Sequence, residues 1–305
     1  MPLMFIKILV TVVLVAGLSP LLEGFMRKLK AFIQSRIGPP IYQPYLDIVK
    51  LIGKENLQVT DNFLFKLAPI LCFGAVLTAS LFVSFGFSPA LSGSGDLIAF
   101  IYLITLSSVA IFIGGLASSN PYAGMGSLRE LILLFTVEPI LAVTLIVASI
   151  KANSMIMTQL PISAFSISMA ISAIGFFLSI QPQLAKLPFD LVEADQEIMA
   201  GPFIEYSGPG LAMFKWSFYM KEFIFASLFW RVFVNWPNFH NYQIHHTLAT
   251  VLNTVTNLAE AIVLLAIVEL IDVTNPRLRI DQSLKYFGTI IFMVMCGLAF
   301  ALIGA

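Results

Sequence analysis

The chain has 305 residues, of which 58% are hydrophobic and only 11% are charged, and its mean hydropathy is +0.92. A soluble domain carries about 25% charged residues because its surface faces water, so most of this surface must face another solvent. The formal net charge of zero argues against a general nucleic-acid-binding protein. A lipid bilayer fits, since a spanning helix needs about 20 mainly apolar residues.

Eight apolar stretches follow one another along the chain, and each is about long enough to cross a bilayer. They lie near residues 3–25, 66–88, 97–117, 128–149, 163–182, 210–234, 249–271 and 284–304. No shift in composition and no flexible linker separates them. The sequence therefore predicts an all-α polytopic membrane protein of about eight transmembrane helices, with a single membrane domain over residues 1–305.

The basic residues are distributed unevenly between the two sides of this arrangement. Of the 17 Lys and Arg residues, only Lys7, Lys151 and Arg231 fall on one side, and Lys215 and Lys221 fall within a span. Because cytoplasmic loops carry the excess of Lys and Arg, the other side is expected to be cytoplasmic, with both termini outside. The predicted cytoplasmic loops cover about 26–65, 118–128, 183–209 and 272–283.

Short helices are expected within these loops. Residues 26–33 are basic and amphipathic enough to lie at the membrane interface as a short helix, and residues 42–53 follow the Gly38-Pro39-Pro40 turn as another. In the third loop, Pro188 suits the first turn of a helix because its missing N–H needs no partner there.

The same third loop carries a dense group of acids. On a helix beginning at Pro188, Asp190, Glu193 and Glu197 are spaced i, i+3 and i+7 and share one face. A solvated acidic face is one interpretation. The other is a set of carboxylates that exchange protons, because like charges held close together are neutralised by protons or cations.

Four further acids, Glu138, Glu222, Glu260 and Glu269, lie inside the apolar stretches. A charge in mid-membrane costs at least ~2.5–3.5 kcal/mol, so such residues pair, face a polar interior or are protonated. Each could be paired for structural reasons alone, for example with Lys215 or Lys221. For the set as a whole, a proton-carrying row is the favoured hypothesis.

No metal site is predicted in this chain. Cys72 and Cys296 lie far apart in apolar stretches, whereas an iron–sulfur cluster usually needs four thiolates. His240, His245 and His246 gather in one outer loop without an accompanying acid, and they are interpreted as solvated loop histidines.

Two loop motifs resemble a known family. Residues 35–51 read SRIGPPIYQPYLDIVKL and residues 187–197 read LPFDLVEADQE, and a Lys54-Glu55 pair and a Glu205-Tyr206 pair follow them. Both are similar to the loops of the eight-helix H/ND-one-type subunit of respiratory complex I. Lys186 before the second motif, and the run Glu205-Tyr206-Ser207-Gly208, are more similar to the membrane subunit of energy-converting [NiFe] hydrogenases of the formate hydrogenlyase and Ech-like type.

The resemblance implies a non-catalytic membrane anchor and coupling subunit of an ion-translocating oxidoreductase complex in the inner (cytoplasmic) membrane. It implies a peripheral [NiFe]-type large subunit, an iron–sulfur small subunit and antiporter-like membrane subunits as partners, with the [NiFe] site and clusters held by those partners. The implied docking-loop residues are Arg36, Gly38, Pro39, Pro40, Gln43, Asp47 and Lys50. The implied proton or charge relay comprises Asp190, Glu193, Asp195, Glu197, Glu205, Glu138 and Glu55, with Lys186 tuning the loop acids.

One position departs from the family pattern. Gln183 stands where both branches commonly have a Glu four residues before Leu187, and an amide neither binds nor releases a proton. Two alternatives therefore stay open: a quinone-chamber subunit of a complex I-like NADH or cofactor:quinone oxidoreductase, and, from another class, a secondary ion transporter.

Overall fold

The computed structural model describes residues 2–93, 95–160, 166–237, 239 and 245–304, with only the backbone described at residues 2, 3, 195 and 246. This described part is helical and contains no strand. The eight long helices are α1 (Pro2–Ile33), α3 (Phe63–Ser80), α4 (Asp96–Ala117), α5 (Pro121–Ala152), α6 (Ile167–Gln183), α8 (Gly208–Phe229), α9 (His246–Thr274) and α10 (Ile280–Ile303). Short elements are α2 (Gln43–Ile52), η1 (Met157–Gln159), α7 (Asp195–Ile198), η2 (Gly201–Phe203) and the π-helical η3 (Trp230–Val234).

Each predicted apolar stretch coincides with one long helix. Six of these helices are long and apolar enough to cross a membrane, and α6 is a shorter apolar helix. The remaining helix, α8, has 22 residues and carries Lys215, Lys221 and Glu222 within it. The prediction of a helical membrane protein with about eight spans is confirmed.

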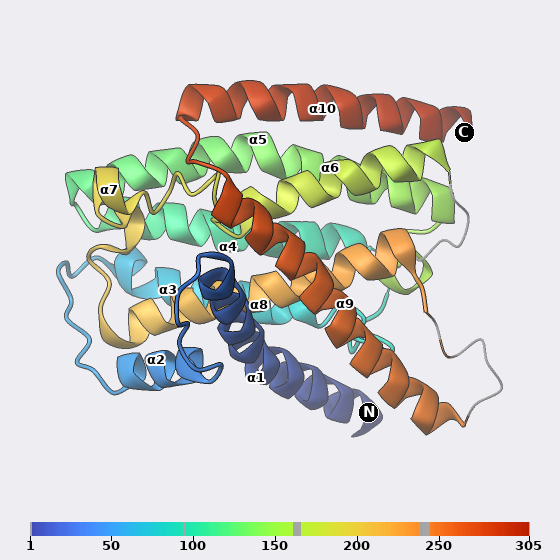
Figure 1. Ribbon diagram of the computed structural model, residues 1–305, viewed down its shortest axis with the longest axis horizontal. Helices are drawn as coiled ribbons and strands as arrows, with labels where there is room; N and C mark the ends of the chain where they lie inside the picture. Colours follow the sequence, from blue (N-terminus) through green and yellow to red (C-terminus); the bar gives the residue numbers. More distant parts are fainter. Residues whose placement is uncertain (1, 94, 161–165, 238, 240–244, 305) are drawn as a thin grey trace.

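The helices run back and forth between two ends of the molecule (Figure 1). Both termini lie at one end, and α2, α7 and the α9–α10 connection lie at the other. The predicted loops 26–65, 118–128, 183–209 and 272–283 therefore share one end, hereafter the loop end. The central helix α8 packs against α1, α2, α3, α6 and α9, so its charged residues are surrounded by protein.

Two prolines inside helices receive compensating hydrogen bonds from aromatic side chains. A proline lacks the N–H that would bond the carbonyl four residues earlier. Pro20 thus leaves the Ala16 carbonyl without its helical donor, and Trp216 Nε1 of α8 donates to that carbonyl at 3.0 Å. Pro69 does the same to Phe65, whose carbonyl accepts the Tyr206 hydroxyl at 3.0 Å. These bonds fix α8 and its preceding loop against α1 and α3.

Two boundaries predicted from the sequence are wrong. Residues 26–33 are the last turns of α1 rather than a separate interfacial helix, because Arg27 and Lys30 on these turns pair with buried acids of the bundle. The second loop is shorter than predicted, because α5 begins at Pro121, where the Asn120 side chain accepts from the Tyr122 N–H at 2.9 Å. Gly126 therefore lies inside a helix, where an added Cβ would be 2.6 Å from Pro202 Cδ.

Candidate functional site

A partly buried lysine at the loop end gathers acids from three membrane helices. Lys186 follows α6, and its Nζ lies 3.0 Å from Glu222 of α8, 3.3 Å from Glu269 of α9 and 3.5 Å from Glu23 of α1. The side chains of these three acids are 3–10% exposed, and that of Lys186 is 18% exposed. A chain segment outside the spans thus provides the cation for carboxylates inside them.

Further ion pairs extend this centre across α1 and α2. Arg27 binds Glu23 and Asp47 at 2.8 and 2.9 Å and donates to the Tyr219 hydroxyl at 2.6 Å. Lys30 pairs with Asp272, and its Nζ lies 3.7 Å from Glu269. The Leu187 N–H also donates to Asp272, at 2.7 Å. We refer to the charged residues Glu23, Arg27, Lys30, Asp47, Lys186, Glu222, Glu269 and Asp272 as the Lys186 network.

The network holds Lys186 in its charged form. Burial by itself lowers the pKa of a lysine because the charged form loses its hydration. The negative charges of Glu222, Glu23 and Glu269 outweigh that effect and keep the pKa of Lys186 well above its usual value. Lys186 is therefore a fixed cation at neutral pH, and a change in the carboxylates around it changes the charge of the whole network.

The acids of the loop after Lys186 do not form the predicted helical face. Only Asp195–Ile198 is helical, and residues 188–194 are turns and irregular segments. Phe189, Leu191 and Val192 are at most 4% exposed, so packing of these apolar side chains overrides the helical pattern. A Cβ on Gly201, which has a positive φ of 52°, would lie 2.1 Å from the Val192 carbonyl oxygen, which shows how tightly the loop folds back.

The loop acids instead find separate basic partners. Asp190 pairs with Arg277 at 2.6 Å, and Glu197 pairs with Arg129 at 2.7 Å. Arg129 also donates to the Leu191 carbonyl at 3.2 Å. These ion pairs fasten the loop to α5 and to the α9–α10 connection. The ion pairs of Lys186 among the described residues are with the membrane acids, and its tuning of the loop acids stays a prediction.

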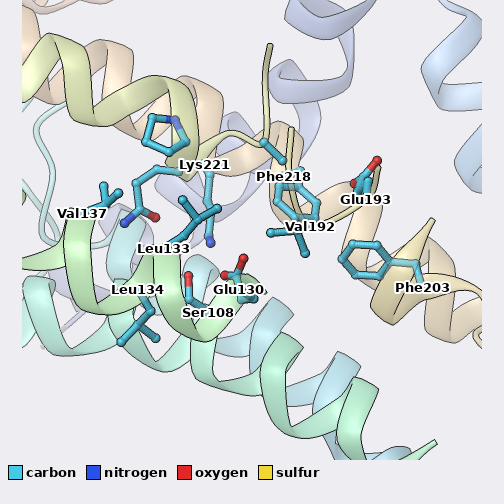
Figure 2. A pocket seen from close by; sticks show the side chains of 13 residues that line it. Ser108, Glu130, Leu133, Leu134, Val137, Val192, Glu193, Phe203, Phe218 and Lys221 are labelled. Atoms are coloured by element: carbon cyan, nitrogen blue, oxygen red, sulfur yellow. The ribbon is translucent and has the colours of Figure 1, made fainter. Parts of the chain in front are cut away.

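Glu138 lies deeper, along α5, and is 7% exposed. Its carboxylate accepts from Gln183 Nε2 at 2.9 Å and from Thr105 Oγ1 at 3.3 Å. Gln183, which the sequence marked as a departure, is thus the direct neighbour of Glu138. Glu193 and Gln183 both line a cavity between α4, α5, α6 and α8 (Figure 2).

The other predicted positions lie closer to the surface of the loop end. Glu205 accepts from the Asn120 side chain, and Glu55 is exposed. The side chain of Asp195 and those of two predicted loop histidines, His240 and His246, lie outside the described part of the structure.

The predicted docking loop divides into two parts. Arg36, Pro40 and Lys50 are exposed, whereas Gly38 and Pro39 are partly buried. Gln43 donates to Asp47 at 3.1 Å, and Asp47 joins the Lys186 network through Arg27. The end of the loop that contains α2 is thus connected to the buried acids.

Sequence reasoning missed several members of the network. Glu23, Arg27 and Lys30 are spaced i, i+4 and i+7 on α1, and Asp272 follows Glu269 by three residues on α9. These residues could have been found from the sequence, because each lies three or four residues from another charged residue in or at the end of a span. The pairing of Glu222 with Lys221 or Lys215, one alternative from the sequence, is wrong, because Lys186 is its ion-pair partner among the described residues.

The fold and this network define a polytopic helical membrane protein with a buried, multiply paired charge centre at one end. The family described as NADH dehydrogenase matches residues 6–303. This chain belongs to that family, as its two loop motifs predicted.

Three relatives match most of this chain. Hydrogenase-4 component C of Escherichia coli (strain K12) is 38% identical over 234 residues, covering 73% of each chain. Formate hydrogenlyase subunit 4 of the same organism is 31% identical over 90% of this chain and 91% of that protein. An NADH-quinone oxidoreductase subunit of Deinococcus deserti is 30% identical over 94% of this chain and 81% of that protein.

A solved structure has the same fold. The membrane-bound sulfane sulfur reductase, an archaeal respiratory membrane complex, contains a chain with a TM-score of 0.88 and 27% identity. The superposition covers 98% of this chain and 99% of that chain. The similarity thus extends over the whole arrangement of helices and loops.

Proposed function

We propose that this protein is the membrane anchor and coupling subunit of a multisubunit ion-translocating redox complex, most simply an energy-converting [NiFe] hydrogenase that reduces protons to H₂. The observation that carries the proposal is the Lys186 network, in which a loop residue binds acids of α1, α8 and α9 at 3.0–3.5 Å. Two relatives named as a hydrogenase component and a formate hydrogenlyase subunit support the hydrogenase assignment.

The network suits coupling because it is rich in carboxylates and buried. Three basic residues, Lys186, Arg27 and Lys30, face the five acids of the network. At low dielectric, charges a few ångströms apart interact far more strongly than in water. A displacement of the loop, or the arrival of one proton, therefore changes forces on three membrane helices at once.

The partners belong to this proposal. A peripheral [NiFe]-type large subunit and an iron–sulfur small subunit would dock on the loop end at Arg36, Gly38, Pro39, Pro40, Gln43, Asp47 and Lys50, and they would hold the metals. Antiporter-like membrane subunits would lie beside the helices. In this arrangement the loop end faces the cytoplasm, both termini lie outside the inner membrane, and Asp190, Glu193, Asp195, Glu197, Glu205, Glu138, Glu55 and Lys186 carry protons or charge.

The test uses the assembled complex. Affinity purification through this chain should recover nickel, iron and H₂-evolving activity, and vesicles containing the complex should take up ions during turnover. In Glu193→Gln the complex should assemble but lose ion uptake, because Glu193 lines the cavity that leads toward Gln183. Asp61→Asn is the matched control, since the Asp61 side chain is fully exposed.

Two results would overturn parts of this proposal. Full ion uptake by Glu193→Gln vesicles would remove Glu193 from the relay. A purified complex without nickel that reduces a quinone would favour the second candidate, a quinone-chamber subunit, for which the 30% identity to an NADH-quinone oxidoreductase subunit is the specific support.

A further inference from the structure

A second lysine, Lys221, lies buried next to the Lys186 network but outside it. It is 1% exposed, and none of the ion pairs among the described residues includes it. Its neighbour in sequence, Glu222, binds Lys186 instead, because successive side chains of a helix point about 100° apart. Glu222 therefore belongs to the Lys186 network, whereas Lys221, the residue before it, does not.

Lys221 lines a cavity of about 20 Å³, enough for about one water molecule, shared with Glu130 and Ser108, the loop residue Glu193 and the amide of Gln183. Figure 2 shows the side chains of Lys221, Glu130 and Ser108 pointing toward a common space, with Glu193 farther along it. A cavity with this many polar groups is suited to hold water, because each water needs two to four polar partners. Water there would solvate the ammonium, which forms no ion pair with a carboxylate in the part of the chain that the structure describes.

The cavity does not give protons a continuous path to Glu138. Gln183 lies between them, since it lines the cavity and donates its amide to Glu138 at 2.9 Å. An amide side chain has no proton to exchange at neutral pH. Lys221 shares the cavity with Glu130 and with Gln183, the hydrogen-bond partner of Glu138, and its long flexible side chain carries a compact charge.

We propose that Lys221 is a mobile cation that carries charge between Glu130 in the cavity and Glu138 behind Gln183. When a proton from bulk solvent reaches the Glu130 carboxylate through the cavity water, the carboxylate becomes neutral and attracts the ammonium less, so that the ammonium moves toward Glu138. When Glu130 returns that proton to the water, the ammonium moves back. No proton crosses Gln183, and Lys221 gains and loses none. The inference rests on the proposed coupling function and assigns it a charge carrier.

The charged groups around this movement come from several helices. Glu130 and Glu138 belong to α5, and Glu193 belongs to the loop after α6. On α8 the Nζ of Lys221 also lies 5.6 Å from the ring centre of Phe218, a distance at which an aromatic face attracts a cation. The aromatic face thus stabilises the ammonium in the position that it occupies in the structure.

The functional test compares single and double variants of the whole complex in liposomes, measured as ions moved per electron transferred. We expect Lys221→Gln to lower this ratio ~10-fold, within the range of coupling between distinct sites. Adding Gln183→Glu should restore it, because a carboxyl at position 183 opens the direct proton path that the amide closes. Lys215→Gln on the exposed side of the same helix should leave the ratio unchanged.

A second measurement is independent of turnover and of any effect of Lys221→Gln on folding. In the complex with Cys72 and Cys296 replaced by Ala, Ser108→Cys places a thiol on the cavity, and Ser107→Cys places one at a neighbouring site that is 0% exposed. A small water-soluble thiol reagent should modify the residue 108 variant at least ~10-fold faster, since buried, unhydrated thiols are inert.

The outcomes separate the inference from the proposed function. A wild-type complex that moves no ions would refute the proposed function. A wild-type complex that moves ions equally well with Lys221→Gln, or a double variant as impaired as the single one, would overturn the role of Lys221 alone. Equal labelling of the two cysteine variants would show that the cavity is dry, and would overturn it as well.

Discussion

Replacing Lys186 with methionine tests whether the network is one energetic unit. The substitution keeps an unbranched side chain but leaves Glu222, Glu269 and Glu23 buried without the cation that lies within 3.5 Å of each. Removing one partner of a buried ion pair typically destabilises a protein by about 3–5 kcal/mol. At roughly 2–4 °C per kcal/mol, the apparent melting temperature should fall by on the order of 10 °C.

Cys72 offers a direct assay of unfolding, because its side chain is 1% exposed and reacts only when the helices around it separate. With Cys296 replaced by Ala, a thiol-reactive dye reports the melting temperature of the detergent-purified protein through residue 72 alone. Adding Glu222→Gln to Lys186→Met should recover part of the loss, since one of the uncompensated charges is then removed.

Lys54→Met is the matched control, because Lys54 is exposed and belongs to none of the ion pairs among the described residues. The reasoning is refuted if Lys186→Met melts within 2 °C of the control, a difference of roughly 1 kcal/mol or less. It is also refuted if the double variant is less stable than the single one, because the acids would then not depend on Lys186 for compensation.

Three further outcomes follow from the geometry. Because the pKa of Lys186 is raised in the folded protein, its stabilising effect is complete below the unfolded pKa of about 10.4 and is lost only as the pH rises through the higher folded pKa. The melting difference between wild type and Lys186→Met should therefore not shrink from about pH 6 to about pH 9, and a steady decline over that range would contradict the assignment. Trp216→Phe should lower the free energy of unfolding by ~1–3 kcal/mol, because it leaves a backbone carbonyl unpaired. This loss should be smaller in a Pro20→Ala background, which restores the helical donor. Equal losses in both backgrounds, measured by the same thiol assay, would disprove the compensation. Gly126→Ala should destabilise the protein by ~1–3 kcal/mol through backbone overpacking. Gly124→Ala should not, because its Cβ would meet nothing within 4 Å. Similar melting temperatures of the two variants would show that the close approach at Gly126 is absent.

Local pattern determined the helices of this protein, but it was a poor guide to the loop that carries the motifs. The apolar stretches are long enough that only a helix satisfies their backbone groups in a membrane, so every predicted span corresponds to a helix. In the third loop, the i, i+3, i+7 spacing of Asp190, Glu193 and Glu197 favoured a helix. Burial of Phe189 gave that segment a different conformation.

The composition and order of residues by themselves determined that the chain is a membrane protein, that its loops gather at one end, and that acids lie within its spans. Only the tertiary structure decided which charges meet. Lys186 binds Glu269 and Glu23 across 83 and 163 residues of sequence, and Lys221 turns away from its neighbour Glu222 toward the cavity. The physical reason is that ion pairs act over a few ångströms. Their partners are therefore set by how α1, α6, α8 and α9 pack, which sequence spacing does not contain.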